Sequence, residues 1–163
     1  MKKIILFIFA VFALALTPPK EFSAKFIQTV VSDGQKITYK GSVYKNGNEI
    51  VWKYTYPTDK TIWVKDKIYV YEPDLMQVTI ANKKNASLSE ILKNAKKVKE
   101  NLYVANVDNK KIYFIYDNTL KELYYNDEFD NKVKIRFFDQ KNEAPKEVFE
   151  LDFPDDVDVI YQN

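Results

Sequence analysis

Residues able to carry out catalysis are scarce in this chain. It contains no histidine and no cysteine, so Ser-His-Asp and Cys-His arrangements are excluded and the commonest general base is absent. The serines, at positions 23, 32, 42, 87 and 89, do not lie in the Gly-x-Ser-x-Gly pattern of a nucleophile elbow. A pair of carboxylates could still support glycoside hydrolysis, but no surrounding motif favours that alternative. The residue types therefore predict a protein that is not an enzyme.

Two acidic clusters, within residues 127–130 and 155–158, are the remaining candidates for metal binding. Neither has the spacing and the glycine of a calcium-binding loop. A zinc site without histidine or cysteine would have to use carboxylates alone, which is uncommon. We interpret both clusters as solvated turns rather than as calcium sites, and we predict neither a metal nor a cofactor.

The amino-terminal segment has the pattern of a secretory signal. Two lysines precede an apolar run over residues 4–16, which is too short to cross about 30 Å of hydrocarbon as a helix. Residues 13–15, Ala-Leu-Ala, have the small-x-small pattern that signal peptidase requires. We therefore expect residues 1–15 to be a cleaved signal peptide and residues 16–163 to form a single domain; the alternative is an uncleaved membrane anchor.

Charge and cysteine content restrict the partners of the mature chain. The formal charge of the full chain is +2, and removing Lys2 and Lys3 brings it to 0. A neutral chain without a basic stripe is a poor nucleic-acid binder. Without cysteine, the chain can form no disulfide and cannot carry the amino-terminal lipid of a bacterial lipoprotein. These observations predict an exported protein of the periplasm that does not bind nucleic acid.

Strand-like segments follow one another along most of the chain. In residues 22–31, 36–44 and 49–56, apolar side chains recur at every second position, the period of a half-buried strand. In the third segment, this places Ile50, Trp52 and Tyr54 on one face. Further candidate strands are residues 60–65, 67–71, 76–81, 101–107, 110–116, 120–125, 132–139 and 147–153. The short connections imply antiparallel pairing, because a parallel crossover needs a dozen or more residues.

One segment, residues 87–94, has helical rather than strand periodicity. Ser87 followed by Glu90 matches a capping box, in which each side chain satisfies a free backbone N–H of the other. Three apolar residues then share one helical face: Leu88, Ile91 and Leu92. A single amphipathic helix in a β-rich chain must lay this face against the sheet.

The apolar face of the predicted sheet has two possible roles. A twisted antiparallel sheet of about ten strands tends to curl, and one short helix cannot cover its concave side. The face could pack on itself as the core of a closed barrel, or it could line a cavity for a ligand. The residues alone leave these alternatives open.

Residues 41–80 contain a pattern that resembles the LolA family of periplasmic outer-membrane lipoprotein carriers. The matching positions are Gly41, Val43, Tyr44, Trp52, Pro57, Tyr71, Pro73, Gln77 and Val78. Upstream, the sequence FSAKFIQ at residues 22–28 is similar to the first strand of the family. Downstream, residues 148–160 are similar to its closing strand and tail. The resemblance covers most of the chain and is weakest over residues 94–145.

The resemblance implies a mainly β (α+β) fold, an unclosed antiparallel β-barrel of about ten to eleven strands with a short helical lid. It implies a monomeric chaperone whose hydrophobic cavity binds the acyl chains of lipoproteins. An inner-membrane ABC transporter would load the carrier, and an outer-membrane lipoprotein receptor would accept the cargo. The alternative is a periplasmic β-rich ligand-binding or adhesion module without lipid traffic.

Seven residues are predicted to contact the acyl chains. Strand alternation and the family's cavity place Phe26, Ile50, Trp52 and Tyr54 in the cavity wall, and helical spacing places Leu88, Ile91 and Leu92 on the lid. One feature departs from the family, which usually carries an Arg-Pro pair before the tryptophan, with the arginine implicated in gating the lid. Here that stretch, residues 45–50, reads KNGNEI, and the few residues between position 15 and Phe22 leave little room for the family's amino-terminal helix.

Overall fold

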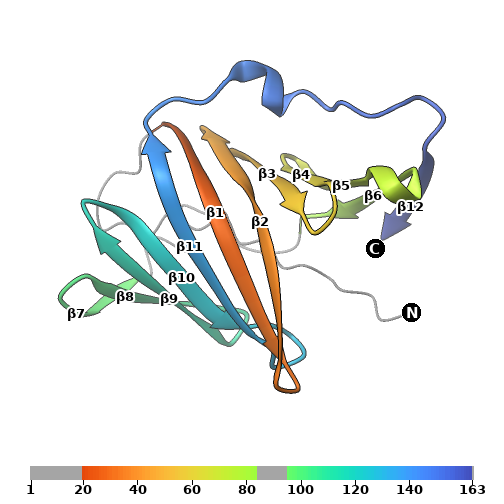
Figure 1. Ribbon diagram of the computed structural model, residues 1–163. Helices are drawn as coiled ribbons and strands as arrows, with labels where there is room; N and C mark the ends of the chain where they lie inside the picture. The colour runs from red at the N-terminus through yellow and green to blue at the C-terminus, as the bar shows by residue number, and fades with distance from the viewer. Residues whose placement is uncertain (1–19, 84–94, 163) are drawn as a thin grey trace.

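The protein folds into one curved sheet of twelve strands, seen in the computed structural model in Figure 1, which describes residues 20–83 and 95–162. The strands are β1 (Glu21–Ser32), β2 (Gln35–Asn46), β3 (Glu49–Tyr56), β4 (Lys60–Val64), β5 (Lys67–Glu72), β6 (Gln77–Asn82), β7 (Lys96–Lys99), β8 (Leu102–Val107), β9 (Lys110–Asp117), β10 (Thr119–Asn126), β11 (Lys132–Lys141) and β12 (Asp158–Gln162). Two 3-10 turns accompany them, η1 (Pro73–Leu75) and η2 (Lys146–Phe149).

The sheet is unclosed, which confirms the predicted fold class. Its order is β12-β6-β5-β4-β3-β2-β1-β11-β10-β9-β8-β7, so β12 and β7 lie at opposite edges and are not paired with each other. Neighbouring strands pair antiparallel, apart from β12, which runs parallel to β6. Tight hairpins create this order. Asp33 and Gly34 between β1 and β2, and Asp108 and Asn109 between β8 and β9, all have positive φ, as a two-residue type I′ turn requires.

Three segments differ from the prediction. Strand β12 was not predicted, and its parallel pairing with β6 departs from the expected antiparallel pairing, because the long segment after β11 lets the chain return to the far edge of the sheet. Residues 147–153 were expected to form a strand but instead contribute to η2 and an extended stretch without strand pairing. Residues 96–99 were not among the predicted strands but form the edge strand β7. Lysines at an edge are physically reasonable, because charged side chains discourage pairing with another chain.

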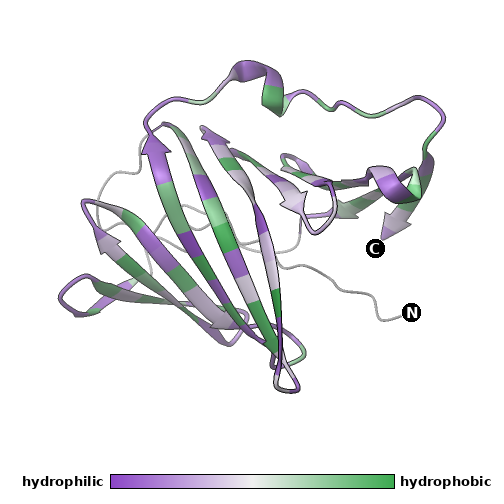
Figure 2. Ribbon diagram, in the orientation of Figure 1, coloured by the Kyte–Doolittle hydropathy of each residue, from purple (hydrophilic) through white to green (hydrophobic). Residues whose placement is uncertain are grey.

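The main core lies on one face of the sheet, which we call the inner face. Period-two alternation sends Phe22, Ala24 and Phe26 of β1 to this face, where each is at most 4% exposed. Val43 of β2 and Trp52 of β3 lie on the same face and belong to the same buried cluster. Figure 2 shows the alternation as bands of apolar and polar residues along β1 and β11. The inner face is therefore continuous across both halves of the sheet.

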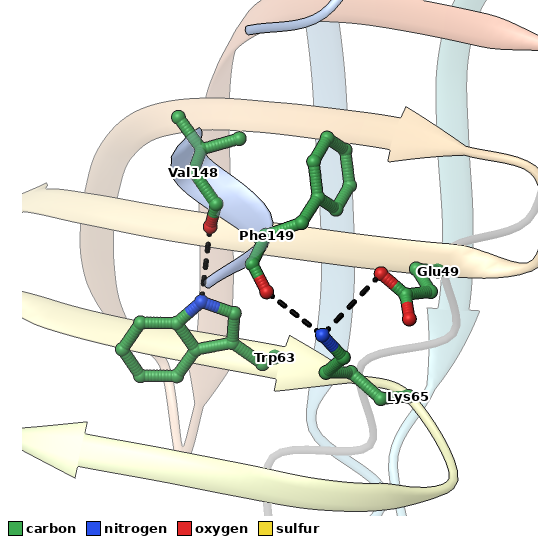
Figure 3. A network of polar contacts seen from close by, with 5 residues as sticks. All are labelled: Glu49, Trp63, Lys65, Val148 and Phe149. Carbon is green, nitrogen blue, oxygen red and sulfur yellow. Dashed lines mark hydrogen bonds and ion pairs between the residues drawn. The ribbon is translucent and has the colours of Figure 1, made fainter. Parts of the chain in front are cut away.

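The opposite, outer face is covered over β2–β5 by the segment between β11 and β12, residues 142–157, which we call the strap. Trp63 of β4 packs with Val51 and with Phe149 of the strap in a second buried cluster. The Trp63 Nε1–H donates to the Val148 carbonyl at 3.0 Å, and the Lys65 ammonium donates to the Phe149 carbonyl at 2.8 Å (Figure 3). Lys65 also pairs with Glu49 at 3.4 Å. These contacts fasten the strap to the sheet.

Two predicted elements lie outside the described residues. The first is the signal peptide, residues 1–15. The second is the helix at residues 87–94, so the placement of Leu88, Ile91 and Leu92 on a lid stays a prediction. Within the described ranges, no helix is long and apolar enough to cross a membrane.

Candidate functional site

The inner face brings together the four cavity residues predicted on the strands. Phe26 of β1 contacts Trp52 and Tyr54 of β3 edge to face, with ring centroids 5.0 and 5.1 Å apart. Ile50, which precedes Trp52 by one period of the alternation, belongs to the same buried cluster. Each of the four is between 1% and 4% exposed. Strands β1 and β3 are held at this spacing by β2, where Gly41 lies directly between Phe26 and Tyr54 in the register.

Gly41 is required at this position by a close approach of the backbone. A Cβ atom built there would overlap the carbonyl group of Lys53 on β3. The register between β2 and β3 also shifts between Lys40 and Gly41. The glycine therefore lets β2 and β3 approach beneath the aromatic cluster, where any larger residue would force them apart.

A buried polar pair interrupts the apolar surface. The Tyr54 hydroxyl donates to Gln28 Oε1 at 2.9 Å, and the two residues are 4% and 2% exposed. Burying a hydroxyl or an amide without a partner is costly, so each group stabilises the other in this position. The inner face is thus largely apolar but contains a fixed polar point next to Phe26.

The tyrosines of this face stay neutral over a wide pH range. Burial raises the pKa of Tyr54 well above 10.0, and the neighbouring Tyr125 and Tyr39 raise it further. Burial also raises the pKa of Tyr125, with a smaller effect from Asp127, and burial raises the pKa of Tyr39. Their hydroxyls therefore present hydrogen-bonding groups without charge, which suits contact with uncharged chains.

Two nitrogen atoms on the inner face have distinctive surroundings. Trp52 Nε1 is buried and has no hydrogen-bond acceptor within the described part of the chain. Lys45, at the end of β2, is only 5% exposed, and its ammonium donates to the Lys20 carbonyl at 3.4 Å. Burial lowers the pKa of Lys45. This lysine is the cation in the stretch where the family usually carries its arginine.

A pocket of about 160 Å³ opens onto the inner face at the hairpin ends of β8–β9 and β10–β11. Its apolar walls are formed by Val107, Ile112 and Tyr125. Because β12 and β7 are not joined, the sheet can widen without breaking a strand pair. The inner face could therefore accept an apolar ligand by separating its two edges.

The sequence prediction missed the half of the inner face that β8–β11 contribute. These strands supply Ala105, Ile112, Phe114, Leu123, Ile135 and Phe137 to the same cluster as Trp52. Alternation in residues 110–116 and 132–139 could have identified several of them, since their apolar positions also recur with period two. The structure thus extends the candidate site from two strands to most of the sheet.

Both acidic clusters lie at turns. Asp127 Oδ1 accepts hydrogen bonds from the backbone N–H groups of Phe129 and Asn131 at 2.8 and 2.9 Å, and Oδ2 accepts one from the Asn131 side chain. In the second cluster, the Val157 N–H donates to the Pro154 carbonyl at 3.4 Å across the turn at residues 155–156. No group of three or more potential metal ligands occurs among residues 20–83 and 95–162.

One unclosed antiparallel sheet, apolar along its inner face and strapped on its outer face, defines a half-barrel protein with a candidate apolar binding surface. The chain is 34% identical over 122 residues to an outer-membrane lipoprotein carrier protein of Wolinella succinogenes, covering 71% of each chain. It is 31% identical over 121 residues to the protein of the same name from Helicobacter pylori, covering 72% of this chain and 66% of the other. The chain therefore belongs to the outer-membrane lipoprotein carrier protein family, which confirms the resemblance found in the sequence.

The remaining comparisons concern family models and solved structures. No family model matches the chain. A crystal structure of an uncharacterized conserved protein from Thermus thermophilus superimposes with a TM-score of 0.57 at 11% identity, covering 89% of this chain and 92% of that one. At this identity, the likeness supports the shared fold alone.

Proposed function

We propose that this protein is a periplasmic carrier that holds the acyl chains of lipoproteins against its inner face and moves them from the inner to the outer membrane. The observation that carries the proposal is the continuous apolar cluster of the inner face, in which Phe26, Trp52 and Tyr54 pack together. Both relatives are named as lipoprotein carriers, which supports the same function. In this role the protein performs no catalysis, and its partners are an inner-membrane ABC transporter and an outer-membrane receptor.

The free energy of transferring acyl chains into water explains why such a cargo needs a carrier and why the carrier must bind it with only moderate affinity. Burying one methylene is worth about 0.8 kcal/mol, so an acyl chain of about 15 methylenes resists transfer into water by roughly 12 kcal/mol. A lipoprotein with three such chains would not cross an aqueous space unaided. Affinities without covalent bonds saturate near about 20 kcal/mol, and a carrier must also release its cargo.

The polar pair on the inner face supports moderate rather than maximal affinity. An acyl chain lying beside the Tyr54 hydroxyl and Gln28 cannot hydrogen-bond to either group, so contact there contributes less than contact with Phe26. The unclosed edges would allow the face to open for loading and to narrow after release. Lys45, buried at the end of the face, is our candidate for the gating function of the family's missing arginine.

The two tryptophans provide a direct test, because they report on opposite faces. Trp52 belongs to the inner cluster and Trp63 to the outer one, and the chain has only these 2. W63F leaves Trp52 as the sole reporter, and W52F leaves Trp63 as its matched control. We expect a lipopeptide with brominated acyl chains to quench the fluorescence of W63F strongly and that of W52F little.

Equal quenching of both variants would place the chains elsewhere, and no quenching with no measurable lipopeptide binding would favour a β-rich module without lipid traffic. Extraction of lipoproteins from spheroplasts by the wild-type protein then tests the transport step. Native mass spectrometry of the protein purified from periplasm tests for bound lipoprotein.

A further inference from the structure

The outer face over β1, β2 and β9–β11 is not covered by the strap and forms a hollow of about 1030 Å³. We call it the basic hollow. Its cationic lining residues are Lys36, Lys110, Lys111, Lys132, Lys134 and Arg136, and its acidic ones are Glu122, Asp127 and Asp130. Cations thus outnumber carboxylates two to one on a chain whose total formal charge is only +2.

Strand register places the cations on one continuous surface. Val31 of β1 pairs with Lys36 of β2 on one side and with Lys132 of β11 on the other. Two positions further along β11, Lys134 pairs with Tyr124, which in turn pairs with Tyr113. The rings of Tyr113 and Tyr124 are stacked, with centroids 5.0 Å apart and planes inclined by 8°. The floor of the hollow is therefore aromatic and its margin is cationic.

The carboxylates of the hollow are already engaged. Glu122 pairs with Lys134 at 3.0 Å and with Arg136 at 3.8 Å. Asp127 accepts the hydrogen bonds that hold its own turn. Lys36, Lys110, Lys111 and Lys132 have no ion pair with any residue in the described ranges. The positive charge that remains available comes from these four lysines.

A large apolar side chain projects at the same end of the sheet. Phe129 is 62% exposed at the tip of the β10–β11 turn, in which Asp127 and Asp130 line the basic hollow. The Phe129 N–H donates to Asp127 Oδ1 at 2.8 Å, and this bond fixes the turn. Exposed apolar groups on an ordered turn beside free lysines are unfavourable in water but suit a bilayer interface.

The outer face is electrostatically asymmetric. The strap contributes Glu143, Glu147, Glu150, Asp152, Asp155 and Asp156, with Lys146 as its single cation. The strap packs over β2–β5, whereas the basic hollow is lined mainly by residues of β9–β11. Figure 1 shows the strap running from the end of β11 towards β12 at the opposite edge of the sheet. A negatively charged plane would attract the hollow and repel the strap, so this distribution orients the molecule.

We propose that the basic hollow, with Phe129 at its end, docks on anionic phospholipid headgroups at a bilayer surface. Lysines without ion pairs attract the headgroups, the two tyrosines lie at headgroup level, and the Phe129 side chain enters the interface. A soluble acidic protein would match the charge but would give no role to an exposed phenylalanine on a fixed turn. This docking goes beyond acyl-chain binding, since it uses the face opposite the inner cluster.

The test measures binding of the intact protein to lipid vesicles by sedimentation. We expect binding to phosphatidylglycerol vesicles that weakens with added salt, and little binding to phosphatidylcholine vesicles. Absence of binding to phosphatidylglycerol at low salt overturns the proposal. Binding to polyglutamate without binding to these vesicles would assign the hollow to an acidic protein and would also overturn it.

A matched pair of variants separates the hollow from total charge. K36Q/K111Q/K132Q removes three of the four lysines without ion pairs, and K96Q/K97Q/K99Q removes three exposed lysines from edge strand β7. Each interfacial lysine is worth about fivefold in affinity, so we expect the first variant to lose on the order of 100-fold and the control much less. Equal losses would show a nonspecific charge effect and would contradict the proposal. Circular dichroism and thermal melting establish that both variants fold.

Absence of cysteine allows a single reporter group to test the orientation. A nitrobenzoxadiazole dye on F129C should gain fluorescence on phosphatidylglycerol vesicles as it leaves water. The same dye on V98C of β7, where Val98 is 54% exposed, should change little. A larger change at position 98 than at position 129 would refute docking through the hollow.

Discussion

The hydrogen bond between Tyr54 and Gln28 allows a quantitative test of the inner face. Y54F removes the hydroxyl donor and leaves Gln28 Oε1 buried without it, whereas Q28M removes the amide and leaves the Tyr54 hydroxyl buried. Both replacements keep most of the side-chain volume. The double variant replaces the polar pair with apolar groups of similar shape.

The expected magnitudes follow from the geometry of the pair. The bond is 2.9 Å long, and both residues are at most 4% exposed. An unsatisfied buried polar group costs about 1–3 kcal/mol, so each single variant should lose that amount of unfolding free energy. Replacing both partners can be nearly neutral. The double variant should therefore lose less unfolding free energy than the two single variants lose together. We expect this difference, the coupling energy, to be about 0.5–3 kcal/mol.

Urea unfolding of the four proteins, followed by circular dichroism, measures this coupling. Additivity within about 0.5 kcal/mol would refute the reasoning, because it would mean that the two groups do not satisfy one another. The same variants address release of cargo. If acyl chains lie on the inner face, the double variant should bind a lipopeptide more tightly and release it more slowly than the wild-type protein does.

Three further predictions concern stability. G41A should lower the free energy of unfolding in urea by at least about 1–3 kcal/mol, since its Cβ overlaps the Lys53 carbonyl. A loss below about 0.5 kcal/mol, which is typical of a neutral surface substitution, would contradict the close approach of β2 and β3. W63F should lose about 1 kcal/mol more than W52F, because only Trp63 donates to a strap carbonyl; equal losses would mean that this bond does not fasten the strap. Burial raises the pKa of Tyr54 above 10.0, so the unfolded chain loses this proton first and stability should fall above about pH 10, by up to about 1.4 kcal/mol per pH unit for this group. Between about pH 9 and 12, the unfolding free energy of Y54F should therefore fall less steeply with pH than that of the wild-type protein. An unchanged slope would contradict a raised pKa for Tyr54.

Alternation predicted the first three strands well because one of their faces is buried along most of its length. Phe26, Ile50, Trp52 and Tyr54 all lie on the inner face, as the period of two required. Val51 lies on the opposite face, as the same alternation requires, and it is only 1% exposed because it packs with Trp63 and Phe149. Local sequence cannot show that a distant segment will return to cover that face.

The strap explains why residues 147–153 were interpreted as a strand. Phe149 and Phe153 both pack against the outer face of the sheet, and apolar residues spaced through an extended segment produce the same pattern whether or not the backbone pairs. Strand β7 was missed for the opposite reason, since Val98 is its only apolar residue. Sequence periodicity reports which side chains are buried, and it does not report the hydrogen-bond partners of the backbone.

The position of β1 has a consequence for how the chain reaches its folded state. β1 pairs with β2 through a short hairpin, but its other neighbour is β11, so that Ser23 lies opposite Lys141. The contact between β1 and β11 closes a very long loop, which is entropically costly and slow compared with hairpin formation. A nascent chain that lacks β11 exposes one side of β1 and half of the apolar inner face. Folding of the sheet must therefore wait until nearly the whole chain has emerged. Until then, the exposed apolar surface of the incomplete chain is accessible to chaperones.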